Sequence, residues 1–286
     1  MTAPITTQSA TSAEWSTIRQ LGAVEARRML LHPAYLFCLA FTVLAGASLV
    51  WGDGIGPDPL PGLPYAVAML FGALFYPLAT VVAANRVAAA TLRRAPRETL
   101  DVTPTREQQR TMAACLGVVR GPALIGVAVM LFMDVIAPFT LTASTLNGLT
   151  PRGVLEHLQV PVIVLGGGLL GIALARWVRI PGALALVVLA LWFSHLTIAD
   201  AAQTVGGLVS GPVWLVLIPT WLFTDATMLT PSPVSQEMWH LVYLLGLALL
   251  AGVAALLHAP ANRRPLLLAG TVLVVITGIA AVLQMG

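Results

Sequence analysis

The sequence predicts an all-α membrane protein with several transmembrane helices. Of its 286 residues, 58% are hydrophobic and only 9% are charged, whereas about 25% of the residues of a typical soluble domain are charged. The mean hydropathy of +0.88 agrees with this bias. Several uncharged runs also reach the roughly 20 apolar residues that a helix needs to cross the bilayer core. These observations exclude an ordinary soluble globule.

The N-terminal segment, residues 12–31, predicts an amphipathic helix that lies in the cytoplasmic membrane interface. Thr11 followed by Glu14 fits a capping box at its start. One helix face carries apolar or small residues, and arginines lie mostly elsewhere. That face holds Trp15, Ile18, Gly22, Ala26 and Met29, with Trp15, Ile18 and Met29 as its large side chains. A plain extension of the first span is the alternative. Residues 1–15 are polar and have no basic region that leads into an apolar core, so no cleavable signal peptide is expected.

Seven membrane-length apolar runs follow and define the expected spans. They are residues 33–51, 65–84, 113–137, 160–177, 181–198, 239–257 and 266–285. An eighth run, residues 205–224, is interrupted by three glycines and two prolines. This interruption favours a broken, re-entrant segment that the protein buries. We therefore expect a six-span core with the re-entrant segment between spans five and six, plus an extra C-terminal span.

The placement of arginines predicts the orientation. The chain has no lysine, so all 15 basic residues are arginine. With a cytoplasmic N-terminus and with residues 205–224 on the outer side, only Arg152 lies outside. This matches the excess of arginine in cytoplasmic loops, whereas a full crossing by residues 205–224 would move Arg263 and Arg264 outside. We expect a multi-pass protein of the inner, cytoplasmic membrane of a bacterium.

The expected domains follow from these spans. Residues 1–32 form the cytoplasmic N-terminus and the amphipathic helix, and residues 33–258 form the transmembrane domain. Residues 259–286 form a cytoplasmic turn and the extra C-terminal span. Within the transmembrane domain, residues 85–112 are the long cytoplasmic loop.

That loop contains the most charged stretch of the chain, with five arginines and three acids in residues 91–110. The basic excess is small and lacks interleaved aromatic residues, so nucleic acid is not an expected partner. Arg93 and Arg94 lie close to the second span and suit anionic lipid headgroups. A solvated loop that obeys the positive-inside rule is the simplest alternative.

A third interpretation of the loop is a docking surface for another protein. Pro96 and Pro104 bracket a short helix or turn, and Thr103 is a candidate cap for a second helix with Pro104 at its first position. A short structured element with charges of both signs suits contact with a protein partner.

Three stretches together resemble the ABC-2 type transporter permeases. RRAPRETLDVTPTREQQR, residues 93–110, is similar to the loop between the second and third spans of that family. WHLVYLLGLALLAGVAALL, residues 239–257, looks like its last core span, and ARRMLLHPAYLF, residues 26–37, looks like the start of its first span. The resemblance covers roughly residues 15–260, mostly through architecture. The span after Arg264 lies outside the family's six-span core.

The resemblance implies that the loop couples the chain to a separate ABC ATP-binding protein. The residues implied in this coupling are Arg94, Arg97, Glu98, Thr99, Leu100, Asp101, Thr103, Pro104 and Arg106. ATP and Mg would then bind to the partner subunit, with no cofactor or metal in this chain. The missing lysine agrees, because a P-loop needs one. A second permease protomer, identical or different, would pair with this one about a central path.

Few charges lie within the spans, and each such charge is a candidate functional group. Asp134 lies near the outer end of the third span, and His195 and Asp200 lie in the outer part of the fifth. Each fits either a headgroup-level boundary residue or a translocation path or outer gate. Pro212 and Pro219 of the broken segment belong to the same candidate gate.

Enzyme chemistry in this chain is not supported by the sequence. No HExxH motif, cysteine pair or nucleophile with its base occurs, and Cys38 and Cys115 fit buried small side chains. We expect an exporter of an amphipathic or hydrophobic compound or lipid, because few charges line the spans. An ion-coupled secondary transporter and a non-transporting membrane immunity or assembly protein are the alternatives.

Overall fold

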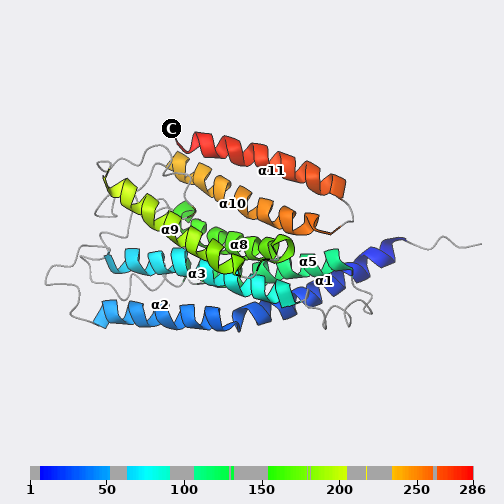
Figure 1. The fold of residues 1–286 in the computed structure, drawn as a ribbon, viewed down its shortest axis with the longest axis horizontal. Helices are drawn as coiled ribbons and strands as arrows, with labels where there is room; N and C mark the ends of the chain where they lie inside the picture. The colour runs from blue at the N-terminus through cyan, green and yellow to red at the C-terminus, as the bar shows by residue number, and fades with distance from the viewer. Residues whose placement is uncertain are drawn as a thin grey trace, which may run out of the picture.

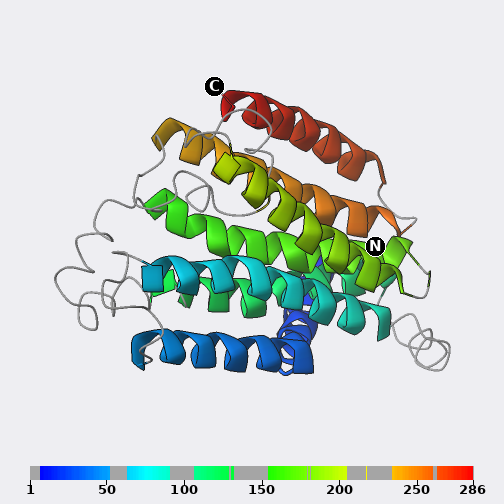
Figure 2. The same ribbon diagram turned by 60° about the vertical axis from the view of Figure 1, so that its left-hand side comes forward.

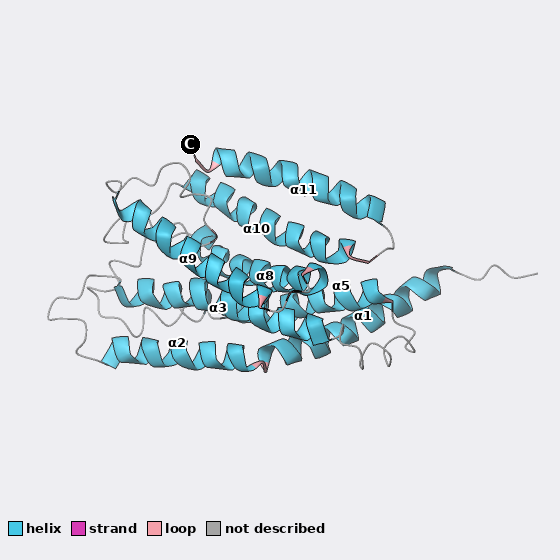
Figure 3. Cartoon of the chain, viewed as in Figure 1, coloured by secondary structure: helices cyan, strands magenta, loops and turns pink. Residues whose placement is uncertain are grey.

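The computed structural model is a bundle of helices. It describes residues 7–51, 63–90, 106–128, 130–131, 154–178, 182–204, 234–259 and 263–285, together with residues 180 and 217. The helices are α1 (Thr7–Leu30), α2 (Pro33–Trp51), α3 (Leu63–Ala90), α5 (Glu107–Val118), the π-helical turn η1 (Val119–Ala123), α8 (Val154–Trp177), α9 (Ala183–Thr204), α10 (Val234–Leu257) and α11 (Arg263–Leu283). The described residues form no strand (Figures 1 and 3). The predicted all-α class is confirmed.

The described helices have the character of membrane spans. Four of them are long and apolar enough to cross a membrane: Glu107–Ala128, His157–Trp177, Val234–Leu257 and Arg263–Leu283. Two shorter apolar helices, Leu74–Ala90 and Ala183–Ser194, accompany them. The exposed side chains of α11 are largely apolar, among them Leu268 and Val282, as expected of a surface that faces lipid. The chain is a multi-pass membrane protein.

Successive helices from α2 to α11 run in alternating directions across the bundle (Figures 1 and 2). Consequently α3, α8 and α10 end, and α5 and α11 begin, at one end of the bundle. We call it the arginine-rich end, because Arg86, Arg106, Arg110, Arg176 and Arg263 lie on these helix termini.

The end of α9 and the start of α10 both lie at the opposite end of the bundle (Figure 1). Residues 205–224 themselves lie outside the described residues, apart from residue 217. Their re-entrant path and the six-span core architecture stay predictions.

Helix α1 begins at Thr7, four residues before the expected cap, so the capping-box prediction at Thr11 is wrong. A turn at residues 31–32 separates α1 from α2, and the Ala34 N–H donates a hydrogen bond to Nδ1 of His32 at 3.2 Å. Figure 2 views α1 nearly end-on while α2 lies across the picture. Helix α1 is therefore not a straight extension of α2.

Most of the apolar face that the sequence predicts for α1 lies buried in the bundle, and its place in the membrane interface stays a prediction. Ile18, Gly22, Ala26 and Met29 are buried, whereas Trp15 is 53% exposed. Helix α1 packs mainly against α5 and η1. At one crossing point, a Cβ atom on Gly117 would lie 3.0 Å from Cβ of Glu25, so a larger residue there would push against α1.

The centre of the bundle is formed by α3, α8 and α10, which pack along one another. Helices α3 and α8 come so close that a Cβ atom on Gly167 would lie 2.7 Å from the carbonyl oxygen of Pro77. Helix α11 packs on α10, where Gly246 faces Thr277.

Helices extend into the predicted cytoplasmic segment 85–112 from both sides. Helix α3 continues to Ala90 and α5 begins at Glu107, while the membrane boundaries of that segment stay predictions. The N-cap of α5 is Arg106 and not Thr103, and Pro104 is not its first residue. Arg106 has an extended backbone, and its N–H donates a hydrogen bond to Oε1 of Gln109 at 2.9 Å. That bond is one half of a capping box, and the observed N-cap lies three residues after the predicted one.

Candidate functional site at the arginine-rich end

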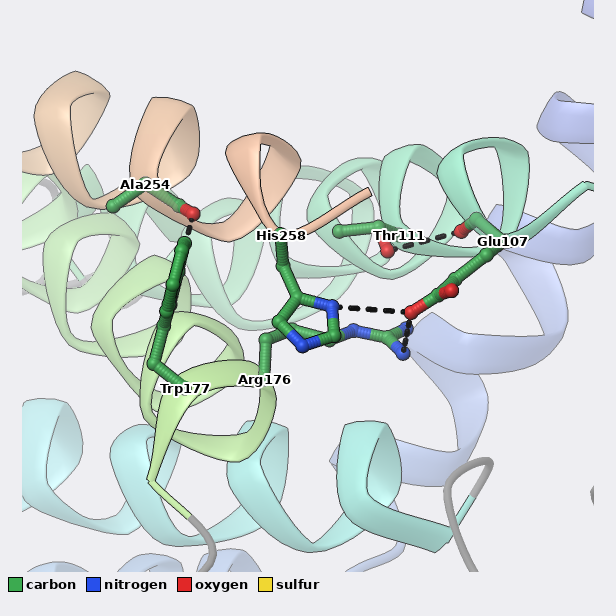
Figure 4. Close-up of polar contacts among 6 residues, drawn as sticks. All are labelled: Glu107, Thr111, Arg176, Trp177, Ala254 and His258. Atoms are coloured by element: carbon green, nitrogen blue, oxygen red, sulfur yellow. Dashed lines mark hydrogen bonds and ion pairs between the residues drawn. The ribbon is translucent and has the colours of Figure 1, made fainter. Parts of the chain in front are cut away.

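Glu107, the first residue of α5, is the centre of a polar cluster at the arginine-rich end (Figure 4). Its Oε1 atom lies 3.7 Å from Nη1 of Arg176 and 3.2 Å from Nδ1 of His258. Arg176 is in the last turn of α8, and His258 directly follows α10. One carboxylate therefore connects the ends of three helices.

Burial makes this connection important for the fold. The side chain of Arg176 is only 3% exposed, whereas Glu107 is 33% exposed and His258 is 20% exposed. A buried guanidinium is costly unless an opposite charge and hydrogen bonds compensate it. Within the part of the chain that the structure describes, Nε of Arg176 is buried without a hydrogen-bond partner. Compensation of the Arg176 charge therefore depends strongly on Glu107.

Neighbouring groups hold the cluster in place. The Thr111 hydroxyl donates to the Glu107 carbonyl at 3.0 Å within α5. Nε1 of Trp177 donates to the Ala254 carbonyl at 2.7 Å, and its ring meets the His258 ring edge-on with centroids 5.5 Å apart (Figure 4). Helices α8 and α10 are thus joined both directly and through Glu107.

The same α5–η1 segment is fixed to α1. Nη1 of Arg120, in η1, donates a hydrogen bond to the backbone carbonyl of Arg19 in α1 at 2.7 Å. Burial of Glu25 in α1 raises the pKa of its carboxyl, and Arg28, 3.3 Å away, opposes this rise. The α5–η1 segment therefore contacts α1 along its length and the ends of α8 and α10 through Glu107.

The structure places few of the residues predicted from sequence. Arg106 is exposed and directly precedes Glu107. The other predicted coupling residues lie outside the described residues: Arg94, Arg97, Glu98, Thr99, Leu100, Asp101, Thr103 and Pro104. Their roles stay predictions.

The candidate gate residues are likewise largely untested. Asp134, Pro212 and Pro219 lie outside the described residues. His195 and Asp200 belong to α9, but the description does not extend to their side chains. Five positions separate them, which is about 140° around a helix at 3.6 residues per turn, so they do not share one helix face.

Sequence reasoning assigned no site role to Glu107, Arg176 or His258. The sequence did contain a signal for the cluster. Two apolar spans end at basic or titratable residues, Arg176 and His258, and another span begins at an acid, Glu107.

No protein-family model and no curated protein matches the chain. Among the described residues, no group of three His, Cys, Asp or Glu side chains could hold a metal ion.

Proposed function

We propose that the chain is the membrane-spanning permease subunit of an ATP-driven exporter of the ABC-2 type. A separate ATP-binding subunit would dock on residues 93–106 and carry ATP and Mg, and two permease protomers would form the transport path. The proposal starts from the resemblance of residues 93–110 to the coupling loops of that family. The observation that carries it further is the contact of Glu107 with both α8 and α10.

This contact offers a mechanical route from a docked partner to the spans. Glu107 immediately follows the charged loop, and α5 continues from it as a helix. A force on the loop would therefore shift the first turn of α5, and the ion pairs of Glu107 would transmit the shift to Arg176 and His258. Packing of α1 on α5 would bring the N-terminal helix into the same movement.

The proposed cargo is an amphipathic or hydrophobic compound or lipid. The spans carry few charges, so a strongly charged cargo would find little compensation there. The proposed location is the cytoplasmic membrane of a bacterium with the arginine-rich end in the cytoplasm, because arginines concentrate on that side of a membrane.

Affinity purification of the tagged chain from mild detergent, followed by an ATPase assay on the eluate, tests the proposal. We expect a stoichiometric ATP-binding protein that is lost when residues 93–106 are scrambled. Arg97→Ala combined with Asp101→Ala should weaken co-purification while membrane insertion stays intact. The matched control is Arg263→Gln with Arg264→Gln, because both arginines are exposed at the same end of the bundle but outside the loop.

Two results would contradict the proposal. One is a chain that purifies without a partner and without ATPase activity, which would favour the ion-coupled or non-transporting alternatives. The other is a partner that binds equally well to the scrambled loop, which would place the docking surface elsewhere.

A further inference from the structure

A cleft of about 490 Å³ lies at the arginine-rich end, between the end of α3, the end of α8 and the start of α9. This volume falls within the roughly 300–1,000 Å³ of typical small-molecule sites. Most of its wall is apolar and includes Leu174 of α8 and Val188 of α9. Two polar side chains of α3, Asn85 and Arg86, complete the lining. The residues of the Glu107 cluster are not part of it, so the cleft is a separate feature.

Arg86 brings a positive charge to this cleft. It is exposed, four residues before the end of α3, and within the described part of the chain it has no ion-pair partner. The described lining residues also include no acidic side chain. Burial, and next the positive charge of Arg86, lower the pKa of His32 in the turn between α1 and α2. Arg86 therefore acts on a second basic group, and an anion in the cleft would compensate its charge.

Asn85 adds a hydrogen-bond donor beside Arg86. Its Nδ2 atom donates to the Gly171 carbonyl of α8 at 3.1 Å, which fixes the amide against the neighbouring helix. A primary amide carries two N–H donors, so this bond leaves one for a ligand. Asn85 and Arg86 are adjacent in sequence and about 100° apart around α3, yet both line the cleft. An anion between them would meet donors from two directions.

The cleft lies at the level where lipid headgroups are expected. Trp177 is 56% exposed and directly precedes Val178, which lines the cleft. Tryptophan prefers the membrane–water interface. From Ala185 in the cleft lining, an exposed row continues along α9 at four-residue spacing through Leu189 and Phe193. A polar site at the interface thus joins an apolar surface that leads toward the membrane interior.

We propose that this cleft binds the headgroup of an anionic phospholipid, with Arg86 on the phosphate and the acyl chains along the exposed row of α9. A guanidinium suits phosphate because its N–H donors can bind two oxygens at once. A head with a net negative charge is favoured over a zwitterionic one, because the described lining offers no acid to an ammonium group. The inference does not depend on the exporter proposal, since a headgroup site requires only that the chain lie in a bilayer.

The first test uses the unaltered chain, so that the folding of a variant does not decide the outcome. A ligand that binds the folded state raises the melting temperature. Phosphatidylglycerol added to the detergent-purified chain should raise it more than phosphatidylcholine does, and inorganic phosphate should leave it unchanged. An equal rise with phosphatidylcholine would mean a general lipid effect and would overturn the proposal. A rise with inorganic phosphate that equals the rise with phosphatidylglycerol would make the free anion the ligand, which also overturns it.

The second test locates the lipid. Phosphatidylglycerol with a diazirine in one acyl chain is incorporated as a minor component into phosphatidylcholine nanodiscs that hold the full-length chain. It should label residues 185–193 of α9, and unlabelled phosphatidylglycerol should suppress this labelling. Arg86→Gln should reduce the labelling by at least about tenfold, because the charge-assisted hydrogen bonds to phosphate are lost. The matched control is Arg264→Gln, an exposed arginine at the same end of the bundle but on α11, which should label like the wild-type chain.

A second pair of variants tests the shape of the cleft. Ala185→Trp should fill the cleft and reduce the labelling, whereas Ala190→Trp should not. Both alanines are exposed on α9, but only Ala185 lines the cleft. Equal labelling of Arg86→Gln and Arg264→Gln, or of the two tryptophan variants, would show that phosphatidylglycerol contacts α9 only as bulk lipid, and the proposal would fail.

Discussion

The polar cluster at the arginine-rich end makes a quantitative prediction for Glu107→Gln. The substitution keeps the shape of the side chain and removes its charge. Arg176 would then remain buried, with a side chain 3% exposed, without the carboxylate that faces it. We expect this variant to destabilise the bundle and to loosen α5 from α8 and α10.

The magnitude follows from the exposure of the two partners. Removing one partner of a fully buried ion pair costs about 3–5 kcal/mol, and a hydrogen bond to a charged group contributes about 1.5–3 kcal/mol. Glu107 is 33% exposed, so water replaces part of its effect and the lower range applies. We expect a loss of about 2 kcal/mol. At roughly 2–4 °C per kcal/mol, the melting temperature should fall by about 4–8 °C.

Thermal melting of the detergent-purified chain provides the assay. A double variant, Glu107→Gln with Arg176→Met, should recover part of the loss, because it also removes the buried charge that the single variant leaves uncompensated. Arg264→Gln serves as the control, since Arg264 is exposed at the same end. Two results would contradict this role of the cluster. One is a melting temperature of Glu107→Gln equal to that of Arg264→Gln. The other is additivity: adding Arg176→Met to Glu107→Gln would lower the melting temperature as much as Arg176→Met does in the wild-type chain.

Three further predictions concern helix packing and the buried carboxyl of Glu25. Gly167→Ala should lower the melting temperature, because the new Cβ would lie 2.7 Å from the Pro77 carbonyl oxygen. The control Gly278→Ala has open space and should gain up to about 1 kcal/mol from helix propensity. Equal changes in melting temperature would contradict the close approach of α3 and α8. Gly117→Leu should displace α1, since a Cβ there already lies 3.0 Å from Glu25, and faster tryptic cleavage within α1 would reveal it; an unchanged cleavage rate would argue against the observed crossing. Burial raises the pKa of Glu25 above 4.5, so the wild-type chain loses stability as pH rises through that raised pKa. Glu25→Gln should therefore melt higher at neutral pH and show no such gain below pH 4.5; a gain that persists in acid would rule out this cause.

Local sequence patterns predicted most of the helices. The run at residues 33–51 matches α2, and the predicted ends at Trp177 and Leu257 match α8 and α10. These boundaries could be predicted from the sequence because an apolar run of membrane length stops where polar or helix-breaking residues begin. The apolar face of α1 could be predicted for a similar reason, since helical periodicity is a local property.

The cluster around Glu107 could not be predicted in the same way. Glu107 and His258 are 151 positions apart, and their contact depends on how three spans pack. Composition placed Arg176 with the other arginines at one side of the membrane but could not show that its side chain is buried. The start of α5 was misplaced for a local reason: Thr103-Pro104 is a strong start signal, yet Gln109 caps the backbone of Arg106 instead.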